Sequence, residues 1–262
     1  MTTLSDRRVC AACKNGQSFP LPFSMAYQPI VDAEAGTVWA FEALVRGPEG
    51  QGAATVLSAV DGENRYSFDQ ACRVKAIETA AGLGMPATGA LLSINFLPNA
   101  VYEPKACIRA TLDAAERTGF PTNRLMFEIT EGEEVVDHAH LARIVAAYKA
   151  MGFKTAIDDF GAGFANLNLL ARFQPDVIKL DMELIRDIDR DRVRRSIVRN
   201  IVNVCTDIGA EVVAEGIETA AEYEVLRGFG LRLFQGYLFA RPGFETLPEP
   251  VWPARERLAL VG

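Results

Sequence analysis

Hydrophobic residues recur along this chain in short runs that alternate with amphipathic stretches. The runs 24–31 and 37–46 are rich in β-formers and flank the turn sequence 32–36, so they predict two paired strands. Further apolar runs at 91–95, 125–129, 155–157, 176–180, 211–214 and 233–239 predict strands, most of them separated by segments with helical spacing. Such alternation is typical of an α/β fold with a parallel sheet covered on both faces. Seven or eight units favour a closed barrel over the alternative, an open doubly wound sheet.

Three of the predicted helices carry distinct local signals. Ser67 with Gln70, and Thr219 with Glu222, have the spacing of a capping box at a helix start. The helix that ends before residue 209 carries apolar residues at intervals of three and four, which is the spacing of one helix face. These residues are Val193, Ile197, Ile201, Val204 and Ile208.

The composition is that of an ordinary globular protein, and its charge narrows the classes of partner. The chain has 262 residues and a formal net charge of −7. An acidic surface argues against general binding to nucleic-acid polymers or anionic membranes, although a small anionic ligand is permitted where cations are bound. No apolar stretch is long enough to predict a transmembrane helix. Five cysteines, a small and odd number, and an N-terminus without an apolar leader predict a cytoplasmic protein.

Composition also divides the chain into three segments. We expect residues 1–22 to be an N-terminal tail, residues 23–245 to be the barrel domain, and the proline-rich residues 246–262 to be a C-terminal extension. The tail contains Cys10-Ala-Ala-Cys13. This pair is either half of a metal site, or a redox pair, or two incidental thiols of an unstructured tail, and the sequence leaves these alternatives open.

Polar residues stand at the ends of successive predicted strands. In a parallel barrel the carboxyl ends of all strands meet at one face, so these residues converge at one mouth although they are far apart in the sequence. A single acidic residue at a strand end is commonly a helix cap, but repetition over seven strand ends favours a shared site. The crowded carboxylates would repel one another unless protons, a lysine or bound cations relieved the charge. The residues are Glu42, Asn95, Glu128, Glu131, Asp158, Asp159, Lys179, Asp181, Glu215, Glu218 and Gln235.

The types of residue in this set favour hard divalent cations. Carboxylates and an asparagine carbonyl suit Mg²⁺ or Mn²⁺. His138 and His140 are the only histidines and no cysteine stands at a strand end, so a zinc site of the usual nitrogen or sulfur type is not expected. The adjacent Asp158 and Asp159 allow one carboxylate to bridge two metal ions while the other binds one of them. Two neighbouring ions stabilise both the attacking and the leaving oxygen in phosphodiester hydrolysis.

Eight short motifs follow one another along the chain. They are Tyr27-Gln-Pro-Ile30, Glu42-Ala-Leu-Val-Arg46, Ser93-Ile-Asn-Phe-Leu-Pro98, Phe127-Glu-Ile-Thr-Glu131, Asp158-Asp-Phe-Gly-Ala-Gly-Phe164, Lys179-Leu-Asp181, Ala214-Glu-Gly-Ile-Glu218 and Gln235-Gly-Tyr237. Together, from about residue 23 to about residue 241, they resemble the EAL domain family. The resemblance implies a modified TIM (β/α)8 barrel whose first strand is antiparallel to the rest. It also implies a homodimer that hydrolyses cyclic di-GMP to linear pGpG with two Mg²⁺ or Mn²⁺ ions.

The resemblance further implies a role for individual residues. Glu42, Lys179 and Glu215 are the catalytic candidates: Lys179 resembles the cationic partner of the attacking water and the scissile phosphate, and Glu215 a general base. A metal-activated water would make a separate base unnecessary. The first metal would be bound by Glu42, Asn95, Glu128 and Asp158, and the second by Asp158, Asp159 and Glu215. Gln28, Arg46, Asp181 and Gln235 would hold the dinucleotide, Glu131 would anchor the loop after Asp159, and Glu218 would support the site.

Two other functions stand as alternatives to the active hydrolase. A catalytically weak EAL domain would act as a cyclic di-GMP receptor, but such relatives usually lose metal ligands, whereas every ligand position of the motifs is filled here. A metal-dependent lyase or aldolase acting on a carboxylate would also use a carboxylate-rich mouth, but it does not account for the ordered motifs. The sequence therefore favours the hydrolase.

Overall fold

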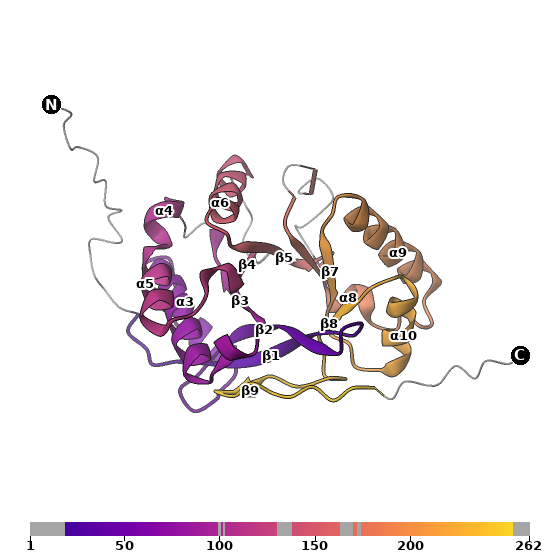
Figure 1. Ribbon diagram of the computed structural model, residues 1–262, viewed down its shortest axis with the longest axis horizontal. Coiled ribbons are helices and arrows are strands. Elements are labelled where there is room, and N and C mark those ends of the chain that lie inside the picture. Colours follow the sequence, from indigo (N-terminus) through magenta and orange to yellow (C-terminus); the bar gives the residue numbers. More distant parts are fainter. Residues whose placement is uncertain are drawn as a thin grey trace, which may run out of the picture.

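Eight strands form a closed barrel in which the first strand runs antiparallel to its neighbours (Figure 1). The computed structural model describes residues 19–98, 101, 103–129, 138–162, 170–171 and 174–253. The strands pair in the order β2-β3-β4-β5-β6-β7-β8-β1, and β1 pairs with β2 to close the ring. This confirms the predicted barrel and excludes the open sheet. The barrel strands are β1 (Ser24–Asp32), β2 (Thr37–Arg46), β3 (Leu91–Phe96), β4 (Leu125–Ile129), β5 (Lys154–Phe160), β6 (Val177–Leu180), β7 (Glu211–Ala214) and β8 (Leu233–Phe234).

The β1–β2 hairpin is the antiparallel part of the barrel. Its pairing extends from Ser24 opposite Arg46 to Asp32 opposite Thr37, and the tight turn between the strands uses Gly36 at a φ of 69°. The far end of β1 pairs antiparallel with β8. Because β1 runs opposite to the other strands, its side chains approach the mouth of the barrel in reverse sequence order.

Helices cover the outside of the barrel, and a short extra strand pairs with β1. In Figure 1, α3, α4 and α5 lie on one side of the barrel, and α8, α9 and α10 lie on the other. Within the described parts of the chain, every helix is too short or too polar to cross a bilayer. The remaining elements are α2 (Ala53–Leu57), α3 (Arg65–Gly82), η1 (Met85–Ala87), α4 (Pro104–Cys107), α5 (Arg109–Thr118), η3 (Thr122–Arg124), α6 (His138–Ala150), α8 (Met182–Ile185), α9 (Arg192–Asp207), α10 (Ala220–Gly228) and β9 (Gly243–Phe244).

Both ends of the described chain contact the barrel domain. The Phe19 ring packs on the Phe68 ring of α3 with their centroids 4.9 Å apart, and the Trp252 ring lies 6.3 Å from that of Phe239. The division into a tail, a barrel and an extension stays a prediction. Cys10 and Cys13 lie outside the described residues.

One predicted capping box forms and the other does not. Thr219 Oγ1 accepts a hydrogen bond from the Glu222 N–H, and Glu222 Oε2 accepts one from the Thr219 N–H, so α10 begins as expected. The box at Ser67 is wrong, because α3 already begins at Arg65 and Ser67 Oγ donates to the Asn64 carbonyl inside its first turn. Asp61 Oδ1 accepts from the N–H groups of residues 63 and 64 in the turn that precedes this helix.

The apolar stripe on α9 faces solvent rather than the barrel. The helix forms as predicted, but the side chains that it buries are Val198, Val202 and Cys205. The stripe residues Val193, Ile197, Val204 and Ile208 are 67%, 43%, 39% and 39% exposed, and Ile201 is half-buried. The helix is therefore apolar on two faces, and the residues that the structure describes cover only one of them.

The lower part of the barrel is filled by one apolar side chain from each strand. Side chains alternate along a strand between the inside and the outside of a barrel, so each strand presents every second residue to the interior. This apolar ring closes the interior below the mouth. Its members are Ile30, Ala40, Leu91, Met126, Ala156, Val177, Val213 and Leu233.

Candidate active site

A ring of polar side chains lies next to the apolar ring, one step nearer the mouth. Each member is two residues from the apolar residue of its own strand, and the alternation of side chains therefore places it on the same interior face. Four members are carboxylates, one is a lysine and three are uncharged, which gives a formal charge of −3 when every acid is ionised. The ring consists of Gln28, Glu42, Ser93, Glu128, Asp158, Lys179, Glu215 and Gln235.

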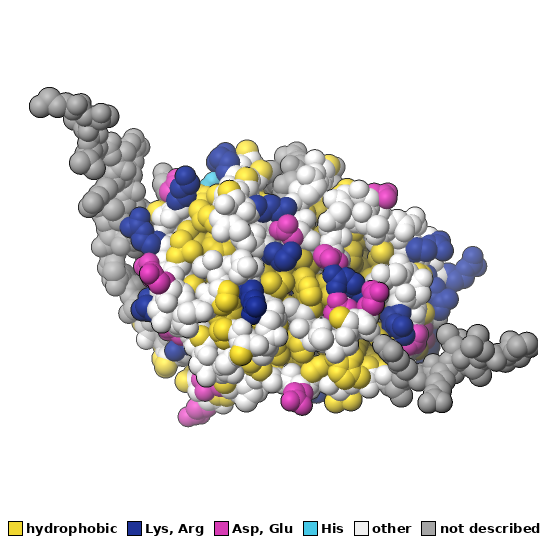
Figure 2. Space-filling view, in the orientation of Figure 1, with side chains coloured by type: hydrophobic (Ala, Val, Ile, Leu, Met, Phe, Trp, Pro, Cys, Tyr) yellow, Lys and Arg dark blue, Asp and Glu magenta, His cyan; other side chains and the backbone are white. Residues whose placement is uncertain are grey.

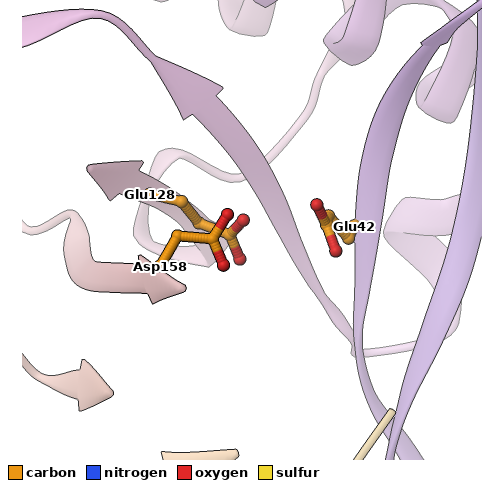
Figure 3. Close-up of side chains that lie close together, drawn as sticks. All are labelled: Glu42, Glu128 and Asp158. Carbon is orange, nitrogen blue, oxygen red and sulfur yellow. The ribbon is translucent and has the colours of Figure 1, made fainter. Parts of the chain in front are cut away.

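Lys179 stands at the centre of the charged part of this ring. Its side chain is 1% exposed, and its Nζ lies 2.7 to 3.3 Å from oxygens of all four carboxylates. Figure 3 shows Glu42, on the hairpin, facing Glu128 and Asp158 from across the barrel. One ammonium thus contacts four acids, and three negative charges stay uncompensated when all four are ionised.

Burial, together with the neighbouring negative charges, raises the pKa of three of the four acids. Burial, together with the charges of Glu42 and Asp158 and against the opposing effect of Lys179, raises the pKa of Glu128 to about 8. Burial and the neighbouring acids also raise the pKa of Asp158 and hold that of Glu215 well above its usual range. For Glu42, burial opposes ionisation, but Lys179 and two amide hydrogen bonds outweigh it and lower the pKa. Without cations, the site therefore binds protons more readily than free carboxylates do.

Asp158 and Asp159 reach the same site although consecutive strand residues normally point to opposite faces. Asp159 has a φ of 50°, in the left-handed region, and the pairing of β5 with β6 shifts register between Ile157 and Phe160. Oxygens of Asp158, Asp159 and Glu215 consequently lie within 4.8 Å of one another. Burial and the adjacent Asp158 raise the pKa of Asp159 to about 6. A non-glycine residue in this conformation costs about 1 to 3 kcal/mol, so the surrounding fold must hold it there.

The donor set fits hard divalent cations. Glu42, Glu128 and Asp158 form a second group whose oxygens lie within 4.8 Å of one another, so Asp158 belongs to both groups. Asn95 lies beside this group and donates its Nδ2 to Glu42 Oε1 at 3.1 Å. Its buried Oδ1 has no hydrogen-bond partner among the described residues. A buried carbonyl oxygen without a donor is destabilising unless something electropositive occupies the space before it. An oxygen-binding cation meets that requirement.

Two amide side chains hold Glu42 from the other side. Gln235 Nε2 donates to Glu42 Oε2 at 2.7 Å and lies 3.3 Å from Gln28 Oε1. Gln28 in turn donates to the Ala240 carbonyl at 3.1 Å, which ties β1 to the segment after β8. Gln235 therefore orients the Glu42 carboxylate, and Gln28 contacts Gln235; the sequence did not indicate either contact.

Four predicted residues are not members of the polar ring or lie outside the described chain. Arg46 donates to the adjacent Val45 carbonyl at the end of β2. Asp181 caps α8 by accepting from the Glu183 N–H at 2.7 Å. Glu218 pairs with Arg186 at 2.9 Å and is partly exposed. Glu131 lies outside the described residues.

Ser93 is a member of the ring that sequence reasoning missed. Its hydroxyl donates to Glu128 Oε1 at 2.5 Å, and the residue is fully buried. A signal was present, because Ser93 precedes Asn95 by two residues and therefore shares its interior face. Serine is common enough in strands that this spacing alone does not distinguish it.

Comparison with known proteins agrees with this geometry. The EAL domain family model matches residues 19–242. A standalone versatile EAL protein from Vibrio cholerae O395, solved with c-di-GMP bound, is 51% identical with a TM-score of 0.86, over 89% of this chain and 98% of that one. BlrP1 of Klebsiella pneumoniae, solved as a manganese and cyclic di-GMP complex, is 38% identical with a TM-score of 0.83, over 90% of this chain and 60% of that one.

Curated relatives are longer than this chain. The blue light- and temperature-regulated antirepressor BluF of Escherichia coli K12 is 32% identical over 231 residues, which are 88% of this chain and 57% of BluF. The cyclic di-GMP phosphodiesterase PdeR of the same bacterium is 38% identical over 115 residues, 44% of this chain and 17% of PdeR. The chain thus spans little more than half, or less, of these relatives. The family model nevertheless matches most of the chain, and this protein therefore belongs to the EAL domain family.

Proposed function

We propose that this protein hydrolyses cyclic di-GMP to linear pGpG with the help of two divalent cations, Mg²⁺ or Mn²⁺. The observation that carries the proposal is the single ammonium of Lys179 among four carboxylates at 2.7 to 3.3 Å. Such a site repels a phosphodiester until cations neutralise it. The family membership and the complexes of the similar structures support cyclic di-GMP as the ligand.

We propose that each of the two groups of oxygens binds one cation. Glu42, Glu128, Asp158 and the carbonyl of Asn95 would hold the first ion, and Asp158, Asp159 and Glu215 would hold the second. When bound, these ions supply Lewis-acid stabilisation of the phosphate and neutralise the surplus charge of the ring. The unpartnered oxygen of Asn95 and the shared position of Asp158 support this assignment.

The chain's own residues have three tasks in the proposed reaction. A water oxygen forms a bond to phosphorus while the bond from phosphorus to the ribose 3′ oxygen breaks, which leaves a 5′-phosphate on the linear product. Glu215 is the proposed acceptor of the water's proton, and the 3′ oxygen takes a proton from solvent. Lys179 is the proposed partner of the negative charge that develops on the phosphate oxygens.

The remaining residues are proposed to hold the dinucleotide or to support the site. Arg46, at the end of β2, offers a guanidinium suited to an anionic phosphate. Gln28, Gln235 and Asp181 are proposed as further contacts, and Gln235 also donates to Glu42. Glu131 and Glu218 stay proposed supporting residues.

Product analysis tests the proposal directly. We expect the purified protein with Mg²⁺ or Mn²⁺ to convert cyclic di-GMP into one product that co-elutes with pGpG, and to form none in chelator. Lys179→Met should be folded by circular dichroism and inactive. No product with either ion would overturn the proposal, and tight binding of cyclic di-GMP in the same samples would then identify a receptor.

We also propose that the protein forms a homodimer through the exposed stripe on α9. The stripe is nearly symmetric about Ile201, since Val193 and Ile197 precede it by eight and four residues and Val204 and Ile208 follow it by three and seven. A two-fold axis that packs α9 antiparallel against a second copy needs this symmetry, because the interface uses the same patch twice. Val193 of one copy would then lie opposite Ile208 of the second copy.

The charges that flank the stripe fit the same arrangement. Arg192 begins α9 and Asp207 ends it, and both are exposed. Antiparallel packing brings Arg192 of one copy to the end that carries Asp207 of the second copy, which is an attractive pairing. Figure 2 shows basic side chains projecting at the edge of the molecule where α9 lies in Figure 1.

The oligomeric state tests the dimer. Light scattering coupled to gel filtration should give a dimer for the wild type and a monomer for Ile197→Asp, since a charge in the centre of an apolar interface is left without solvent or partner. Arg199→Ala, exposed on the same helix but away from the stripe, should stay dimeric. A monomeric wild type at high concentration would contradict the proposal.

A cytoplasmic location is proposed on chemical grounds. Among the described residues, Cys72, Cys107 and Cys205 are free thiols, which suits a reducing compartment. Fractionation of cells that produce the protein tests this location.

A further inference from the structure

A fully buried ion pair lies on α3, next to the barrel. Asp69 and Arg73 stand one helical turn apart, their side chains are 1% and 0% exposed, and Arg73 Nη2 lies 2.7 Å from Asp69 Oδ2. Transfer of two charges from water into the interior costs several kcal/mol, and such a pair is often no more stabilising than apolar residues of similar volume. Stability alone therefore does not account for the pair.

The pair connects α3 to the end of β3. The second carboxylate oxygen, Asp69 Oδ1, accepts a hydrogen bond from the Leu97 N–H at 3.0 Å. Leu97 is the first residue after β3, where pairing with the neighbouring strands has ended. Arg73 extends the connection to the next helices, since its Nη1 lies 3.5 Å from the Cys107 carbonyl and 3.4 Å from Thr111 Oγ1.

The end of β3 carries the amide whose oxygen lacks a donor. Asn95 lies two residues before Leu97, donates its Nδ2 to Glu42 and presents a buried Oδ1 that finds no donor in the described part of the chain. The direction of that oxygen depends on the backbone at residues 95–97. The Asp69 carboxylate fixes this backbone from outside the barrel.

We propose that Asp69 is a positioning residue for the cation site: it holds the Leu97 N–H so that Asn95 directs its free oxygen at the first ion, while Arg73 holds Asp69 in place. The inference rests on the proposed function, because it assigns Asn95 to a bound cation. Groups that orient metal ligands without touching the metal typically change metal affinity about 10- to 100-fold when they are removed.

The two acceptor oxygens explain why a carboxylate is needed at position 69. One oxygen serves the guanidinium of Arg73 and the other serves the Leu97 N–H. An asparagine has one acceptor oxygen, and the buried guanidinium competes for it more strongly than a neutral N–H does. In Asp69→Asn the amide N–H would then face the Leu97 N–H, and the hydrogen bond would be lost. With Arg73→Met added, the asparagine oxygen is released to accept from Leu97 again.

Mn²⁺ titration of these variants, by calorimetry on metal-free protein, tests the inference. We expect Asp69→Asn to weaken Mn²⁺ binding about tenfold or more, and Asp69→Asn with Arg73→Met to restore affinity to within about threefold of the wild type. Thr111→Val removes another contact of Arg73 but leaves the acceptor of the Leu97 N–H, so its Mn²⁺ affinity should be unchanged. If Asp69→Asn does not fold, Asp69→Ala with Arg73→Met takes its place, since that variant removes both charges of the pair and leaves no side-chain acceptor at position 69 for Leu97.

The outcomes separate this inference from the proposed function. If the wild type binds Mn²⁺ and hydrolyses cyclic di-GMP, and Asp69→Asn binds Mn²⁺ equally well, the inference is overturned and the proposed function is not. The inference would also be overturned if Asp69→Asn with Arg73→Met bound Mn²⁺ as weakly as Asp69→Ala with Arg73→Met. The acceptor oxygen at position 69 would then be irrelevant to Mn²⁺ binding. Wild-type protein that binds no Mn²⁺ would overturn both.

Discussion

Replacement of Glu128 by glutamine is expected to stabilise the metal-free protein and to weaken its response to metal. Glu128 is fully buried, lies 3.0 Å from Lys179 Nζ and accepts from Ser93 Oγ. A glutamine in the same place keeps both contacts, because its Oε1 can accept from Lys179 and its Nε2 can donate to the Ser93 oxygen. The substitution therefore removes one negative charge from a ring that has a surplus of three, without leaving a cavity.

The magnitude follows from the shifted pKa of Glu128. Burial and the neighbouring acids raise it to about 8, from 4.5. A raised pKa means that the folded protein binds a proton that the unfolded chain has already lost, so the free energy of unfolding falls as the pH rises from 4.5 to about 8. One such group lowers it by up to about 1.4 kcal/mol per pH unit. Because Asp158 and Glu215 share in the same proton uptake, we expect a gain of about 2 to 4 kcal/mol for the variant at about pH 8.5.

Urea denaturation in EDTA, compared with denaturation in Mg²⁺, measures both effects. In EDTA the free energy of unfolding of the wild type should fall between about pH 6 and about pH 8.5. Its slope against pH should exceed that of Glu128→Gln by the amount that corresponds to about one bound proton. In Mg²⁺ the wild type should gain more stability than the variant, since a ligand that binds only the folded state stabilises it in proportion to its affinity. Glu222→Gln is the control, because that buried carboxylate accepts from backbone N–H groups of the α10 capping box and should leave the metal response unchanged. A variant less stable than the wild type in EDTA at about pH 8.5 would refute the reasoning.

Three further predictions concern the same ring. Lys179→Met should lower turnover by about 10²- to 10⁴-fold in a product assay, because the phosphate loses its cationic partner, and unchanged turnover would exclude that role. Mn²⁺ affinity, measured by calorimetry, should rise from about pH 6 to about pH 8. The reason is that Asp159 and Glu128, with pKa values of about 6 and about 8, must lose protons to bind a cation. An affinity that does not change with pH would contradict this. Gly236→Ala should destabilise the fold by about 1 to 3 kcal/mol and weaken Mn²⁺ binding, because its Cβ would lie 2.1 Å from the Ile217 carbonyl oxygen beside Gln235. Gly228→Ala, which meets nothing within 4 Å, is the control for that variant, and an equal effect of the two substitutions would contradict the steric reasoning.

Much of the fold and of the site could be predicted because strand alternation is a local rule. In the strands other than β1, the apolar residue that fills the barrel interior is followed two positions later by the next interior residue. This rule places Glu42, Lys179 and the other charged members in one ring. The rule does not extend to Asp159, whose direction depends on a left-handed φ and a register shift between two strands. Neither of these is encoded in the spacing of residues.

Contacts between distant elements account for what could not be predicted. Asp69 and Arg73 have the spacing of an ordinary helical ion pair, and their burial against the end of β3 becomes visible only when α3 is packed on the barrel. The stripe on α9 has the spacing of a buried face, but the barrel packs against the other apolar face of the helix and leaves the stripe exposed. Periodicity identifies an apolar face but does not identify the surface that covers it.

The antiparallel first strand has a chemical consequence for the ring. Strands β8, β1 and β3 place uncharged side chains, Gln235, Gln28 and Ser93, on both sides of Glu42, whereas β4 to β7 contribute charged residues in succession. Glu42 is therefore separated along the ring from the other acids, and it approaches Glu128 and Asp158 across the barrel, where Lys179 contacts all three. A cation bound between Glu42 and the pair Glu128 and Asp158 would join the hairpin to the parallel strands, whereas a cation at Asp158, Asp159 and Glu215 would be held by the parallel strands alone. The uncharged arc beside Glu42 leaves the negative charge on one side of the mouth, so that the two cations would present their positive charge to a phosphate from that side.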